Sequence, residues 1–281
     1  MILLHGDPCY GGCDLALGDG ERLGVDLIIH LAHTPLKPGG GDKVVFMDAY
    51  DEVTPSKTLL EKALELSRGR VMGLVSSIQY THLLPLLKDY IEDGGGRCLI
   101  GQPSHKYMRR GQILGCDVSA AKNIMDKVDG FLVLGGGSFH GLGVTLWTGK
   151  ETWVIDPYRD SPINLSSLAK KTLALIAARI EKAKEAQVWG VIMGLREGQM
   201  RWRETSYIIN RLERMGRRVV KIALRELSPE RLRYYPSIEA FVQTLCPRLS
   251  IDDIGGFNTP VLSPDQFKIM VGEMGFEEVY P

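Results

Sequence analysis

Short apolar runs rich in β-branched residues alternate with amphipathic stretches along the whole chain of 281 residues. Runs that are almost wholly apolar predict strands buried on both faces, which are typical of parallel sheets covered by helices. The predicted strands lie at residues 25–31, 44–47, 71–76, 97–100, 131–134, 152–155, 188–193, 218–223 and 240–245. The predicted helices lie at residues 55–67, 81–93, 120–127, 165–186, 199–215 and 264–272. The sequence therefore predicts an α/β protein built on parallel sheets.

Two polar stretches, at residues 48–56 and 157–164, indicate boundaries between domains. They divide the chain into three similar α/β units at residues 1–52, 53–160 and 161–281. The first unit opens directly on a predicted strand at residues 2–5. We therefore expect this unit to be short at its N-terminus.

Charge and composition exclude several classes of protein. Lys and Arg together number 34, as do Asp and Glu, so the chain lacks the basic field of a nucleic-acid-binding protein. The uncharged run at residues 130–149 contains seven glycines, which predicts strand and loop rather than a membrane span. Five cysteines, an odd number, argue against a secreted disulfide framework. We expect a cytoplasmic protein with reduced thiols that binds neither nucleic acid nor membrane.

Three cysteines follow apolar runs at turns, one in each predicted unit: Cys13, Cys116 and Cys246. The carboxyl ends of parallel strands are where α/β sheets carry their sites. Three thiolates brought together there would hold three irons of a [4Fe–4S] cluster and leave the fourth iron open. Local spacing does not establish this, because Cys9 and Cys13 begin the CxxxCxxC loop of standard radical S-adenosylmethionine enzymes but Ala16 occupies its third position.

Each cysteine taken singly also fits the ordinary role of a small buried hydrophobic residue. That role suits Cys98, which lies inside a predicted strand. The role of Cys9 stays open, with a spare thiol beside the site as one reading.

Six phrases carry a resemblance to a known family. They are YGGCD, GVDLIIH, GQILGC, FHGLG, CPRLSIDD and TPVLSP, at residues 10–14, 24–30, 111–116, 139–143, 246–253 and 259–264. In this order they resemble the archaeal diphthamide synthase family over nearly the whole chain. We expect the first domain to lack the segment that members usually carry before the first cysteine motif. Gly12 replaces the usual alanine before the cysteine, a change that we expect to be harmless.

The resemblance implies a non-canonical radical S-adenosylmethionine enzyme, a homodimer of three-domain subunits around a central [4Fe–4S] cluster. By motif position, Cys13, Cys116 and Cys246 are the cluster ligands. The implied reaction transfers the 3-amino-3-carboxypropyl group of S-adenosylmethionine to a histidine of translation elongation factor 2 and releases methylthioadenosine. It requires an electron donor and is the first step of diphthamide synthesis.

The remaining candidate residues would bind S-adenosylmethionine, and no catalytic side chain beyond the cluster is expected. Arg248 and Asp252, just after Cys246, have the charges to pair with the carboxylate and the ammonium of its methionyl part. Gln199 has an amide for the same group. The glycines Gly136 and Gly137 allow close backbone approach to a ligand, and His140 follows them.

Two other interpretations remain. Quinolinate-synthase-like proteins also hold a cluster with one cysteine from each of three α/β domains, but use its open iron as a Lewis acid in dehydration. A non-catalytic partner subunit would use the three thiolates for a structural zinc or a relay cluster. Zinc would prefer a fourth protein ligand, and no histidine stands at zinc-ligand spacing from a cysteine.

Overall fold

The computed structural model describes residues 1–36 and 41–281, and its strands form three separate sheets. The first sheet pairs β1 (Ile28–Leu31) with β2 (Val44–Met47). The second has the order β4-β3-β5-β6-β7 and contains β3 (Val71–Ser76), β4 (Arg97–Ile100), β5 (Gly130–Leu134), β6 (Glu151–Ile155) and β7 (Ile163–Asn164). The third has the order β11-β10-β8-β9 and contains β8 (Val188–Gly194), β9 (Arg218–Leu224), β10 (Ala240–Gln243) and β11 (Val261–Leu262).

All strand pairs are parallel except β6 with β7. The predicted α/β class with parallel sheets is therefore confirmed. The boundaries at residues 52 and 160 stay predictions, and β7 adds Ile163–Asn164 to the second sheet.

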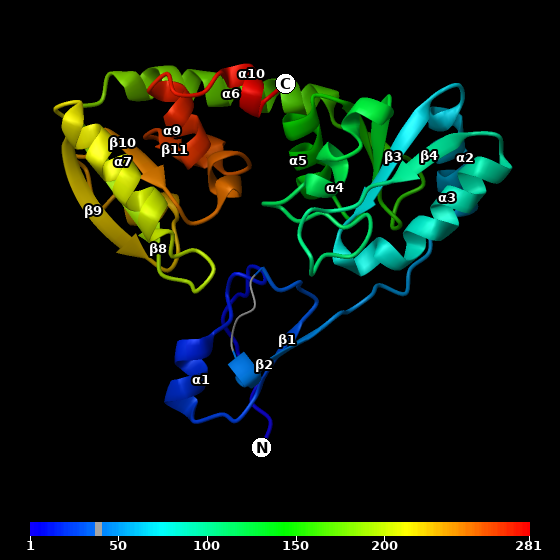
Figure 1. Cartoon of the computed structure of the whole chain (residues 1–281), viewed down its shortest axis with the longest axis horizontal. Coiled ribbons are helices and arrows are strands. Elements are labelled where there is room, and N and C mark those ends of the chain that lie inside the picture. Colours follow the sequence, from blue (N-terminus) through cyan, green and yellow to red (C-terminus); the bar gives the residue numbers. More distant parts are fainter. Residues whose placement is uncertain (37–40) are drawn as a thin grey trace.

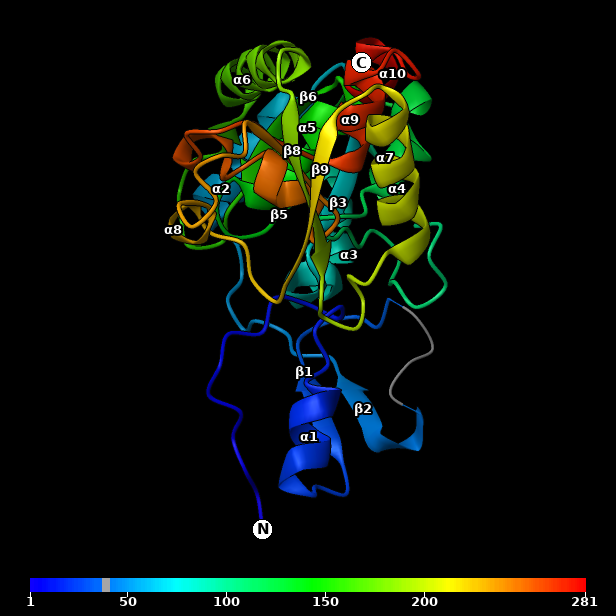
Figure 2. The ribbon, with the colours of Figure 1, turned by 90° about the vertical axis from the view of Figure 1, so that its left-hand side faces the viewer.

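Helices cover the two larger sheets, and the sheets and their helices form three units (Figure 1). The helices are α1 (Leu17–Leu23), α2 (Lys57–Ser67), α3 (Leu84–Asp93), α4 (Ser119–Lys122), α5 (Phe139–Thr148), α6 (Ser166–Lys184), α7 (Trp202–Arg214), α8 (Pro229–Leu232), α9 (Pro264–Met270) and α10 (Phe276–Val279). The longest, α6, runs along both the second and the third unit. Figure 2 shows that the first unit lies apart from the other two.

The second and third units share apolar packing. Leu142 and Leu146 of α5 belong to the same buried cluster as Ile176 of α6 and Trp189 of β8. Among its described residues, the first unit contributes no side chain to the large buried clusters, and Ile29, Leu31, Val45 and Met47 on its two strands are exposed. Polar contacts join this unit to the other two.

Three sequence expectations differ from the structure. Residues 2–5 are not a strand, because this segment has no partner strand and its apolar side chains are exposed. Residues 139–148 form the helix α5, although their glycines favoured strand and loop. The predicted helix at residues 120–127 is only α4 followed by a 3₁₀ turn at Met125–Lys127.

No helix among the described residues is long and apolar enough to cross a membrane.

Phe267 of α9 tests the shared core of the second and third units. Its side chain is fully buried and meets Trp189 edge to face, with ring centroids 6.3 Å apart. Phe267→Ala leaves a cavity, so we expect it to lower the free energy of unfolding by about 3–5 kcal/mol. Tyr234 is 81% exposed, so Tyr234→Ala is the matched control with an effect within about 0.5 kcal/mol. Urea denaturation measures both, and equal effects would contradict the assigned core.

Candidate functional site

Cys13, Cys116 and Cys246 come from the three different units and lie near one another. Cys13 is in the loop before α1, Cys116 in the turn closed by the bridge between Leu114 and Asp117, and Cys246 just beyond β10. Burial raises the pKa of all three thiols. Negative charge on Cys246 further raises the pKa of the other two, and charge on Cys13 raises that of Cys116. The structure therefore brings the three predicted ligands together, while Cys98 lies in β4 with its Sγ 3.8 Å from the Lys88 carbonyl oxygen.

The environment of the sulfurs favours thiolates bound to a metal group. Although part of the Cys116 side chain faces solvent, packing around its sulfur raises its pKa to about 12. A metal group that replaces the proton removes this cost. The positive charge of Arg201 lowers the pKa of Cys116 and Cys246, opposing burial. Gln199 Nε2 donates to Cys13 Sγ at 3.5 Å.

The spacing of the sulfurs bears on which kind of metal group they could hold. Among the residues that the structure describes, the one group of three Cys, His, Asp or Glu ligand atoms within 4.8 Å of one another does not contain these cysteines. A tetrahedral zinc ion would hold thiolate sulfurs about 3.8 Å apart. At least two of the three sulfurs therefore lie more than 4.8 Å apart, which is wider than the edge of one zinc tetrahedron.

Arg248 lies between the second and third units, and its side chain is buried. Its Nη2 donates to Asp252 Oδ1 and to the Phe139 carbonyl oxygen, both at 2.6 Å. Its Nε lies 2.5 Å from Asp252 Oδ2, so both oxygens of Asp252 face this one guanidinium. Within the described part of the chain, Arg248 Nη1 is buried without a hydrogen-bond partner.

Phe139 links the Cys116 turn to Arg248. The Arg248 guanidinium lies over its ring at 4.1 Å from the centroid. A Cβ added to Gly115 would lie 2.6 Å from the same ring, so the turn that carries Cys116 can approach Phe139 this closely only with glycine. Phe139 was not among the residues singled out for this role, because its ring and carbonyl act through contacts distant in sequence.

The glycine loop lies between β5 and α5. Gly137 has φ +66° and its N–H donates to Asp156 Oδ2 at 3.3 Å, while Gly136 is exposed. His140 is half-buried, and burial, followed by the charge of Arg248, lowers its pKa to about 4. The His140 imidazole is therefore neutral near pH 7. Of Gly136, Gly137 and His140, only His140 lies close enough to Arg248 for the charge of the guanidinium to affect its pKa.

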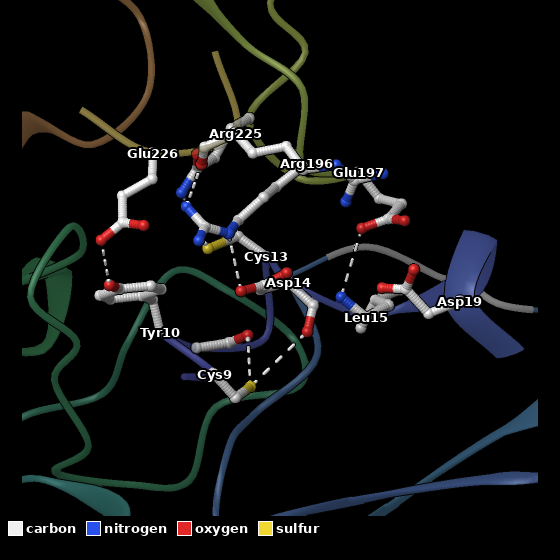
Figure 3. Close-up of polar contacts among 12 residues, drawn as sticks. Cys9, Tyr10, Cys13, Asp14, Leu15, Asp19, Arg196, Glu197, Arg225 and Glu226 are labelled. Atoms are coloured by element: carbon white, nitrogen blue, oxygen red, sulfur yellow. Dashed lines mark hydrogen bonds and ion pairs between the residues drawn. The ribbon is translucent and has the colours of Figure 1, made fainter. Parts of the chain in front are cut away.

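A set of polar contacts fastens the Cys13 loop to the third unit (Figure 3). Asp14 and Arg196 form an ion pair at 2.7 Å, with their side chains only 14% and 12% exposed. Arg196 lies over the Tyr10 ring, whose hydroxyl donates to Glu226 Oε1 at 2.9 Å. The N–H of Gly198 donates to the carbonyl oxygen of Cys13 at 2.9 Å. Arg196 begins a stretch rich in arginine, residues 196–218, and no motif sets it apart from the other arginines there.

Gly198 provides a test of this docking. A Cβ at residue 198 would lie 2.5 Å from Cys13 Cα and 2.6 Å from Cys13 Cβ. Gly198→Ala should push the two loops apart at a cost of about 1–3 kcal/mol, as overpacking does. We expect less iron per chain after anaerobic reconstitution, measured by iron and sulfide analysis.

The control is Gly255→Ala, because an added Cβ there has no atom within 4 Å. Full iron binding by the Gly198 variant would contradict the close contact between these loops.

The chain is similar to known proteins over almost its whole length. It matches the family described as "Putative diphthamide synthesis protein" over residues 1–281. It is 33% identical to 2-(3-amino-3-carboxypropyl)histidine synthase of Pyrococcus horikoshii, covering 99% of this chain and 81% of that protein. It is 30% identical to subunit 1 of the same-named synthase of Gibberella zeae, covering 96% of this chain and 59% of that protein.

A solved structure agrees with this match. The crystal structure of Dph2 from Pyrococcus horikoshii with a 4Fe-4S cluster has a TM-score of 0.86 and 31% identity, covering 99% of this chain and 81% of that chain. Together with the match along residues 1–281, this likeness settles the family. The chain belongs to the diphthamide synthesis protein family.

Proposed function

We propose that this protein transfers the 3-amino-3-carboxypropyl group of S-adenosylmethionine to a histidine imidazole of translation elongation factor 2. Cys13, Cys116 and Cys246 would hold the [4Fe–4S] cluster that this reaction needs. The observation that carries the proposal is the convergence of these three cysteines from three units. The name of the Pyrococcus synthase supports the same reaction.

A bound cluster of this kind supplies one electron to the sulfonium of S-adenosylmethionine. Three protein thiolates leave one iron without a protein ligand, where the substrate can approach. The thiolates come from separate units, so the site is complete only when the three units are assembled. The release of methylthioadenosine follows from cleavage between sulfur and the γ-carbon of the methionyl part.

Two unsatisfied polar atoms suit the methionyl part of the substrate. The Gln199 side chain donates Nε2 to Cys13 Sγ, and its Oε1 is buried without a partner in the described residues. Arg248 Nη1 is likewise buried without a hydrogen-bond partner in the described residues. An amide oxygen can accept from the substrate ammonium, and a guanidinium can donate to its carboxylate.

The other candidate residues would hold Arg248 in place, lie beside it, or leave room for the substrate. Asp252 holds the guanidinium of Arg248, so its effect on the substrate is indirect. Neutral His140 can accept or donate a hydrogen bond beside that arginine. Gly136 and Gly137 leave room for the adenosine part of the substrate in the β5–α5 loop.

The incoming imidazole needs a route to the cluster. A cavity of about 280 Å³ opens next to Cys116, with Trp147 and Arg201 among its lining residues. We propose that the acceptor loop of elongation factor 2 enters here. We also propose that the protein acts as a homodimer in the cytoplasm and receives the electron from an external donor.

The test uses anaerobically reconstituted protein with dithionite, S-adenosylmethionine and elongation factor 2. We expect methylthioadenosine and one added 3-amino-3-carboxypropyl group per elongation factor, measured by chromatography and mass spectrometry. Alanine at Cys13, Cys116 or Cys246 should abolish both the chromophore and the product, whereas Cys98→Ala should retain them.

Deoxyadenosine as the sole nucleoside product would overturn the proposed bond cleavage. A protein that binds the cluster but leaves S-adenosylmethionine intact would favour the Lewis-acid dehydratase instead. A colourless zinc protein would favour the non-catalytic subunit.

Gln199→Leu removes both amide atoms at nearly constant volume. We expect iron binding to persist and the KM for S-adenosylmethionine to rise roughly 10- to 150-fold, since a buried hydrogen bond to a charged group contributes about 1.5–3 kcal/mol. Loss of the donor to Cys13 Sγ should also shift the cluster reduction potential, measured by redox titration. Gln187→Leu, at an exposed position, is the control. An unchanged KM and potential would remove Gln199 from the site.

A further inference from the structure

A second group of potential metal ligands lies in the first unit, outside the three-cysteine site. Cys9 Sγ lies 3.8 Å from His30 Nε2 and 3.9 Å from His33 Nδ1. The two histidine nitrogens lie 3.1 Å apart. Within the part of the chain that the structure describes, no other three Cys, His, Asp or Glu residues bring ligand atoms within 4.8 Å of one another.

These separations match the edges of a tetrahedron around one ion. Zinc bonds of about 2.3 Å to sulfur and about 2.05 Å to nitrogen place sulfur and nitrogen about 3.6 Å apart, and two nitrogens about 3.3 Å apart. The three measured edges depart from these values by only a few tenths of an ångström. A single ion therefore fits between the three atoms with almost no movement.

The backbone around β1 is shaped to bring the two histidines together. His30 lies in β1 and His33 follows two residues after the strand ends. Between them, Ala32 has φ +62°, a conformation that costs a non-glycine residue about 1 kcal/mol or more. The Ala32 N–H donates to the Met47 carbonyl oxygen at 2.9 Å, which holds this turn against β2. The turn returns the His33 side chain to the side of His30.

One thiol and two imidazoles are a donor set that suits a soft-to-borderline divalent cation. Burial lowers the pKa of both histidines, so both imidazoles are neutral and have lone pairs for a metal near pH 7. His30 is buried against the Phe46 ring, whereas Cys9 is exposed. Solvent can therefore reach the group from the Cys9 side and supply a water as fourth ligand, as in zinc sites with three protein ligands.

We propose that Cys9, His30 and His33 form a second, mononuclear metal site of the zinc type, with its fourth coordination position open to solvent. This site goes beyond the proposed reaction, which uses other cysteines. It ties the start of the loop that carries Cys13 to the end of β1. The apo geometry has a competing explanation, in which one histidine simply donates its N–H to the other.

The test uses the full chain carrying Cys13→Ser, Cys116→Ser and Cys246→Ser, which removes the cluster ligands. After chelator treatment, zinc is titrated against a chromophoric competitor, and cobalt is used as a spectroscopic probe. We expect one zinc per chain and a sulfur-to-cobalt charge-transfer band. A further Cys9→Ser or His33→Ala change should weaken zinc binding at least about 100-fold, as loss of a metal ligand does.

The controls are His5→Ala and Cys98→Ala in the same background. His5 pairs with Asp19 and Cys98 lies in β4, so neither change should alter zinc affinity. No stoichiometric zinc, or zinc that survives both Cys9→Ser and His33→Ala, would overturn the site and leave the histidine–histidine hydrogen bond as the explanation.

A second measurement covers the case in which the triple variant does not fold. The intact protein is reconstituted with its cluster, supplied with zinc and analysed for zinc and iron per chain. We expect zinc to fall in Cys9→Ser while iron and methylthioadenosine formation persist. Loss of iron instead would make Cys9 a cluster ligand and overturn the proposal. The two readouts separate failure of this site from failure of the proposed function.

Discussion

Contacts centred on the ion pair between Asp14 and Arg196 hold the Cys13 loop of the three-cysteine site against the third unit. The first unit has few buried apolar side chains, so its own core does not fix its position. Asp14 follows Cys13 directly, and Arg196 lies in the loop after β8 that also carries Gly198 and Gln199. Because the pair is largely removed from water, loss of one partner would leave an uncompensated charge. This ion pair, together with the hydrogen bond from Gly198 to Cys13, sets where the Cys13 loop meets the third unit.

The second unit is joined to the site by different means. Gln112 Nε2 donates to Thr34 Oγ1 at 2.6 Å, and His105 Nε2 lies 2.7 Å from the Leu36 carbonyl oxygen. These contacts tie the segment after β1 to the region that precedes Cys116. The Cys116 turn in turn packs on Phe139, and Phe139 on Arg248. A chain of contacts thus runs from the first unit through the second to the third.

Much of the fold follows from local pattern, and much of the site does not. The apolar runs at residues 71–76 and 188–193 predicted β3 and almost all of β8, since a short continuous apolar run fits few structures other than a buried strand. The helix α5 was not predicted, because Gly141 and Gly143 lower helix propensity. The packing of Leu142 and Leu146 outweighs this cost. The segment at residues 2–5 has a strand-like pattern, but a strand needs a partner that sequence pattern alone cannot supply. The cysteines were identified through phrases around them, whereas the links between Arg196 and Asp14 or Phe139 and Arg248 arise from folding of distant segments.

The shared core of the second and third units has a consequence for the order of cluster assembly. Leu142 and Leu146 pack into the same interior as α6 and β8, so the units that carry Cys116 and Cys246 share one core. Two of the three proposed cluster ligands would therefore be held at a high effective concentration for each other before any iron arrives. Cys13, attached to the small first unit, would be the ligand whose arrival closes the proposed site. Iron loading would then be a two-plus-one process, and its last step would be the docking of a loop instead of the folding of a core.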